Sequence, residues 1–117
     1  MENKKLKNLI KLSSKVSIYV PSTQQTGEKV TDRAAAIDGT CKLMAELFGG
    51  CTHTHAIGTW ILENGKPQNE HIEIVYSYAK ILYIEKIDKV IEWCEELKRQ
   101  CNQEVVSLEV NGELYFI

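Results

Sequence analysis

Apolar residues along this chain switch twice from the two-residue spacing of a strand to the three-to-four-residue spacing of a helix. Each helical stretch has strand-like segments before and after it, which gives the order β-α-β-β-α-β. This order permits few compact solutions, because two right-handed crossovers must interleave around a hairpin. We therefore expect an α+β protein in which two helices cover one face of an antiparallel sheet.

The first strand and the first helix have clear boundaries in the sequence. VSIYV (16–20) alternates and predicts a strand, and the polar stretch 21–29 predicts a loop. Thr31 or Asp32 should cap the following helix. Gly49, after Phe48, should end it, because glycine adopts the left-handed cap conformation at little cost.

The rest of the chain is predicted as two strands, a helix and two further strands, over residues 57–63, 70–78, 83–103, 105–110 and 113–117. The dipeptides Asn64-Gly65 and Asn111-Gly112 are turn signals between paired strands. The complete order is that of the ferredoxin-like fold with one extra C-terminal strand. The sequence therefore predicts one domain over residues 16–117.

Residues 1–15 are predicted as a basic N-terminal arm, since they contain five lysines and one glutamate. The whole chain has a net charge of -2, which gives no general attraction to nucleic acid or to an anionic membrane. No apolar run approaches the ~20 residues that a membrane span needs, and the arm lacks the apolar centre of a signal peptide. We expect a cytoplasmic protein with reduced cysteines.

A short layout of residues supports the same fold by resemblance. A strand that ends in proline is followed by a helix, by FGG-x-T, by G-x-W and by a glutamate; the matching residues are Phe48, Gly49, Gly50, Thr52, Gly58, Trp60 and Glu70. This layout resembles that of a group of small, mostly uncharacterised bacterial and phage proteins. The resemblance implies a ferredoxin-like fold and brings no activity with it. In a phage or mobile element, the natural role would be to sequester a host signal molecule.

The segment LFGGCTHTHAIGTW (47–60) contains the candidate site. Its glycines expose backbone N–H groups, its threonines supply hydroxyls, and its histidines donate or accept near neutral pH. We expect a small anionic or nucleotide-like ligand, held by Arg33, Gly50, Thr52, His53, His55, Trp60, Glu70 and His71. No phosphate-binding motif identifies the ligand.

Two other functions remain open on the sequence alone. His53 or His55 is a candidate general base of a small hydrolase or isomerase, with Glu70 or Glu73 as its partner. The third alternative is a protein–protein interaction module. The residue patterns favour a binding protein over an enzyme, and we predict neither a bound metal nor an organic cofactor.

The uncovered face of the sheet predicts a homo-oligomer, with a dimer favoured over a trimer. The candidates for this face are Val75, Trp60 or Ile61, and Tyr115 or Phe116. Three cysteines, Cys41, Cys94 and Cys101, lie on the apolar stripes of the two helices, where reduced cysteine is usually a small core residue.

Overall fold

Five strands form a single antiparallel sheet in the computed structural model, which describes residues 2–22 and 28–117. Their spatial order is β2-β3-β1-β4-β5. The strands are β1 (Ser14–Pro21), β2 (Thr52–Ile61), β3 (Pro67–Ala79), β4 (Ser107–Val110) and β5 (Glu113–Phe116). This order confirms the ferredoxin-like prediction, and β5 is the extra strand at one edge.

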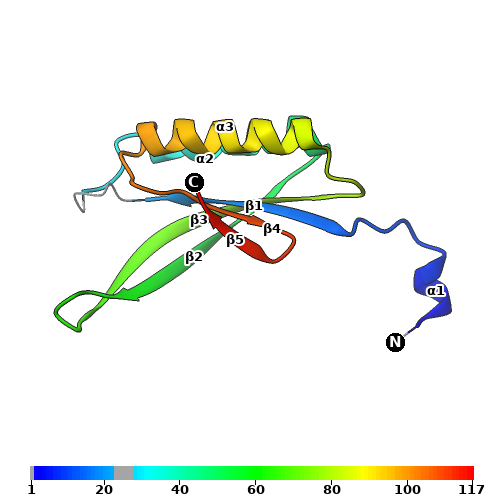
Figure 1. Ribbon diagram of the computed structural model, residues 1–117, viewed down its shortest axis with the longest axis horizontal. Coiled ribbons are helices and arrows are strands. Elements are labelled where there is room, and N and C mark those ends of the chain that lie inside the picture. Colours follow the sequence, from blue (N-terminus) through cyan, green and yellow to red (C-terminus); the bar gives the residue numbers. More distant parts are fainter. Residues whose placement is uncertain (1, 23–27) are drawn as a thin grey trace.

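Two long helices, α2 (Arg33–Phe48) and α3 (Ile84–Gln100), lie side by side on one face of the sheet (Figure 1). A short helix, α1 (Lys4–Lys7), belongs to the N-terminal arm, which extends away from the sheet in the same view. Among the described residues, no helix lies against the opposite face of the sheet (Figure 1). No helix in the described part of the chain has both the length and the apolarity to cross a membrane.

The ends of α2 are those that the sequence predicts. The Asp32 side chain accepts a hydrogen bond from the Ala35 N–H at 3.0 Å, which caps the first turn. Gly49 has a φ of 88°, and its N–H donates to the Ala45 carbonyl at 2.8 Å. The chain then enters β2 at Thr52, three residues after Gly49.

The core lies between the sheet and the two helices. Val16, Ile18 and Val20 of β1 alternate toward the helices and are fully buried. They meet Met44 of α2 and apolar residues of α3 that include Val90, Cys94 and Leu97. The helices also bond to each other, because the Trp93 Nε1–H donates to the Thr40 hydroxyl at 2.9 Å.

Several predicted boundaries shift in the structure. β2 begins at Thr52, five residues before the predicted start at Ile57. The segment THTHA (52–56) lacks the alternation of apolar and polar residues that marks a strand. It nevertheless pairs with β3, beginning with Thr52 opposite Tyr76. α3 ends at Gln100 and β4 begins at Ser107, so the predicted helix and strand were too long. Part of the predicted loop 21–29 lies outside the described residues.

The prediction for the uncovered face was partly wrong. Val75 is fully buried under the helices, because it pairs with Ile18 and shares its face. The residues that alternate with it, Ile74 and Tyr76, lie on the open face instead. Phe116 is also on the open face and is 69% exposed, whereas Tyr115 lies on the helix side.

Candidate functional site

Pairing of β2 with β3 brings several of the predicted polar residues together. His55 lies opposite Glu73, and the neighbouring pairs place His53 and His71 on the same side of the sheet. This is the side that the helices cover, but β2 is an edge strand and its histidines are about half exposed. His53 and His55 are two residues apart on β2, and both side chains therefore lie on this side of the sheet.

The carboxylate of Glu73 is the centre of this group, which we call the histidine–glutamate cluster (His53, His55, His71 and Glu73). The His53 Nδ1–H donates to Glu73 Oε2 at 2.5 Å, and the His55 Nδ1–H donates to Oε1 at 3.3 Å. His55 Nε2 lies 2.8 Å from His71 Nδ1, and the two rings stack with centroids 5.0 Å apart. The hydrogen bond from His53 is the main reason why the pKa of Glu73 is lowered.

This cluster fits proton transfer. A carboxylate that accepts from Nδ1 fixes the imidazole tautomer and leaves Nε2 as the basic nitrogen. His53 Nε2 is therefore the best-positioned base of the cluster, because the His53 side chain is 51% exposed while the Glu73 side chain is 12% exposed. Within residues 2–22 and 28–117, no group of His, Cys, Asp and Glu side chains is arranged to hold a metal ion.

Arg33 joins the cluster from the first residue of α2. Its Nη2 lies 4.0 Å from Glu73 Oε1, and within the described chain its Nε and Nη2 are buried without a hydrogen-bond partner. Arg33, Glu70 and His71 also line a cavity of about 290 Å³. The other lining residues were not among the predicted ligand residues; they are Ser22, Lys29, Val30 and Asn69.

The remaining predicted ligand residues do not join this cluster. Thr52 and Trp60 alternate with the histidines along β2 and therefore lie on the open face. Trp60 pairs with Gln68 near the end of the hairpin and is 42% exposed, so it is not a core residue. Gly50 precedes β2. The predicted set is thus divided between the two faces of the sheet.

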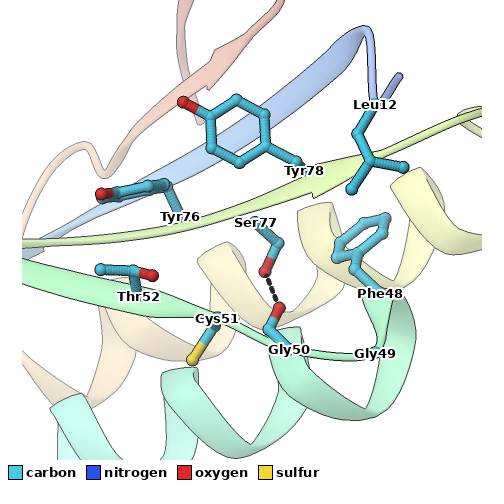
Figure 2. Close-up of a pocket in the computed structure, with 9 residues that line it drawn as sticks. All are labelled: Leu12, Phe48, Gly49, Gly50, Cys51, Thr52, Tyr76, Ser77 and Tyr78. Atoms are coloured by element: carbon cyan, nitrogen blue, oxygen red, sulfur yellow. Dashed lines mark hydrogen bonds between the residues drawn. The ribbon is translucent and has the colours of Figure 1, made fainter. Parts of the chain in front are cut away.

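Gly50 and Thr52 instead line an open pocket of about 370 Å³, which we call the corner pocket (Figure 2). It lies where α2 ends and β2 begins, and its other lining residues are Leu12, Phe48, Gly49, Cys51, Tyr76, Ser77 and Tyr78. The Ser77 hydroxyl donates to the Gly50 carbonyl at 2.6 Å and ties this turn to β3. Figure 2 shows the rings of Tyr76 and Tyr78 on the side of the sheet away from the helices.

The aromatic wall of the corner pocket was missed by the sequence analysis. Tyr76 and Tyr78 belong to a strand that was predicted correctly. The predicted neighbouring strand began only at residue 57, so the pairing of Tyr76 with Thr52 at the start of β2 was not predicted. Their rings meet edge to face with centroids 5.9 Å apart. The alternation Tyr-Ser-Tyr was the available signal, since residues two apart on a strand share a face.

Cys41, Cys94 and Cys101 pack in or against the core, as predicted. Cys94 and Cys101 are fully buried, and burial raises the pKa of Cys94 to about 12. Burial is also the main reason why the pKa of Cys41 is about 11. The Cys51 thiol donates to the Cys41 carbonyl at 3.4 Å. A raised pKa leaves a thiol protonated at neutral pH, which makes it a poor nucleophile.

Comparison with known proteins shows the fold. The sequence matches no protein-family model and no curated protein. A phage SAM lyase in complex with S-methyl-5'-thioadenosine is similar over 94% of this chain and 92% of that one, with a TM-score of 0.65 and 18% identity. A phage SAM lyase in the apo state gives a TM-score of 0.60 and 16% identity, over 93% and 94% of the two chains. The fold is thus shared with phage proteins, and these identities establish the fold alone.

Proposed function

We propose that this protein binds a nucleoside of the S-adenosyl class in the corner pocket. The observation that carries the proposal is the aromatic wall of Tyr76 and Tyr78 beside the polar turn Gly50–Thr52. A purine stacks on exposed aromatic rings, and the turn supplies a hydroxyl and backbone groups for the sugar. A volume of about 370 Å³ suits a small ligand of this size.

The structural neighbours support this choice of ligand. One of them was solved with S-methyl-5'-thioadenosine, which is itself a nucleoside of this class. By analogy, this chain is proposed to bind S-adenosylmethionine and to release S-methyl-5'-thioadenosine from it. In such a cleavage, a carboxylate oxygen of the ligand attacks its own γ-carbon, and the C–S electron pair leaves with the positively charged sulfur, which becomes a neutral thioether. The amino acid part leaves as a lactone, so the step needs no co-reactant. The sequence suggested an anionic or nucleotide-like ligand, and the ligand proposed here is a nucleoside.

Homo-oligomerisation belongs to the same proposal. The open face exposes Phe116, Tyr78 and Leu114, which are 69%, 48% and 49% exposed in the single chain. A sheet face of this composition is usually covered by another subunit. The corner pocket borders this face, so a second copy would close the pocket from the open side.

Binding of S-methyl-5'-thioadenosine by isothermal titration calorimetry tests the ligand. We expect saturable binding, and we expect Tyr78→Ala to weaken it by about tenfold or more. The loss of one stacking surface lowers the binding free energy by ~1–3 kcal/mol. Tyr83→Ala is the matched control, since Tyr83 is 54% exposed and lies at the start of α3, outside the corner pocket. Chromatography of S-adenosylmethionine incubated with the protein then tests cleavage. Absence of binding to both nucleosides would overturn the proposal.

The histidine–glutamate cluster supports a second candidate function, in which His53 is the general base of a small hydrolase or isomerase. The 2.5 Å hydrogen bond between His53 and Glu73 favours it, because this bond orients the imidazole. His53→Ala separates the two candidates. Under the nucleoside proposal it leaves the affinity for S-methyl-5'-thioadenosine unchanged, and under the second candidate it abolishes turnover of the substrate.

A further inference from the structure

The centre of the open face contains a buried hydroxyl that nothing in the described chain satisfies. Ser17 lies on the central strand β1, between Tyr76 of β3 and Glu109 of β4. It is 1% exposed, and its Oγ has no hydrogen-bond partner among the described residues. Buried hydroxyls are nearly always paired, so this position suggests that a further molecule completes the site.

A positive charge is held on one side of this hydroxyl. Lys15 is two residues before Ser17 on the same face of β1, and its Nζ lies 4.6 Å from the ring centroid of Tyr76 and 5.7 Å from that of Tyr78. The backbone of Lys15 is fixed from the other direction, because its N–H donates to Asn111 Oδ1 at 2.8 Å and its carbonyl accepts from the Asn111 N–H at 2.9 Å. The ammonium group is therefore placed beside the aromatic wall of the corner pocket.

A negative charge lies on the other side. Glu109 is the cross-strand partner of Ser17 on β4 and shares the open face with it. Burial raises the pKa of Tyr19, which lies on the same face, and the negative charge of Glu109 raises it further. No ion pair within 4.0 Å joins Lys15 or Glu109 to another residue of the described chain. Both charges are thus available to a ligand.

We propose that Lys15, Ser17 and Glu109 bind the zwitterionic α-amino acid head of the ligand whose nucleoside occupies the corner pocket. Lys15 and the Ser17 hydroxyl donate to the carboxylate, and Glu109 accepts from the ammonium group. The three strands that hold Tyr76, Ser17 and Glu109 are neighbours, so the site spans about 10 Å, or two strand spacings of ~4.8 Å. This inference rests on the proposed function and adds the part of the ligand that S-methyl-5'-thioadenosine lacks.

Two stable nucleosides test this assignment. S-adenosylhomocysteine has the amino acid head, whereas S-methyl-5'-thioadenosine has a methyl group in its place, and the adenosine and the neutral sulfur are the same in both. Calorimetry should show that Glu109→Gln lowers the affinity for S-adenosylhomocysteine by about tenfold or more and leaves that for S-methyl-5'-thioadenosine unchanged. Lys15→Gln should act in the same way, and Glu104→Gln, an exposed residue outside the open face, should change neither affinity.

The outcomes distinguish the two proposals. If the wild-type protein binds both nucleosides equally, or if Glu109→Gln weakens both by the same factor, the amino acid site is wrong and the nucleoside pocket stands. If the wild-type protein binds neither nucleoside, the proposed function is wrong and the inference fails with it. The melting temperature of each variant, measured without ligand, shows whether the fold is intact.

Discussion

The two faces of the sheet differ in what they hold and in how it is held. The helix-covered face is a packed apolar core, and its polar residues gather at the uncovered edge as the histidine–glutamate cluster. The open face carries aromatic rings, Lys15, Glu109 and the buried Ser17, and no helix of the described residues lies above them. Neighbouring residues of one segment, such as Thr52 and His53, therefore belong to different sites, because they point to opposite faces of the sheet.

The largest expected effect concerns stability. Ile18→Ala on the helix-covered face should lower the free energy of unfolding by about 2–5 kcal/mol, because Ile18 is fully buried and leaves a cavity. Ile74→Ala on the open face should lower the free energy of unfolding by clearly less. The comparison is made in a dilute sample, where any association between copies is weakest. Urea denaturation followed by circular dichroism measures both. Equal losses would mean that the open face is as well packed as the core.

A smaller effect is expected for self-association. Phe116→Glu places a charge on the open face and should weaken association of the copies by about tenfold or more, since an unpaired charge at an apolar contact is costly. Ile84→Glu is the matched control, because Ile84 is 75% exposed but belongs to α3 on the other side of the sheet. Light scattering after size-exclusion chromatography measures the mass. A wild-type monomer at micromolar concentration would contradict the oligomer proposal.

The smallest effect concerns the pH dependence of stability. The pKa of Glu73 is lowered from 4.5 in the folded protein, so its ionised form stabilises the fold above that value. This stabilisation is lost as the pH falls below 4.5 and through the folded pKa. It should amount to about 1 kcal/mol or less, because the histidine partners are half exposed.

Thermal melting from pH 6 to pH 3 compares wild type with Glu73→Gln. The difference in melting temperature should shrink as the pH falls, since the glutamine has no charge to lose. A difference that stays constant over this range would show that Glu73 acts through packing alone. Glu104→Gln controls for the general effect of removing one negative charge.

The fold was largely predictable from the sequence, and the site was predictable only in part. Element order, the Asp32 cap and the Gly49 stop are local signals, and the structure has all three. The sequence named Glu73 as one of two possible partners of His53, and the structure places these two side chains in contact. The division of the site was not predictable, because it depends on where β2 begins and on its register with β3. Those are set by long-range pairing, and the polar segment THTHA carries no apolar pattern that reports them.

The ligand is proposed to bind at the open face, and fluorine NMR of protein labelled with 3-fluorotyrosine can locate it there. The chain has five tyrosines, which can report on different regions. Tyr76 and Tyr78 line the corner pocket, while Tyr83 and Tyr115 lie outside it. Titration with S-methyl-5'-thioadenosine should shift the signals of Tyr76 and Tyr78 and leave those of Tyr83 and Tyr115 in place, with each signal assigned by a Tyr→Phe variant. Unshifted signals from Tyr76 and Tyr78 at saturating ligand, with shifted proton signals from the histidines, would place the ligand at the histidine–glutamate cluster and contradict the account.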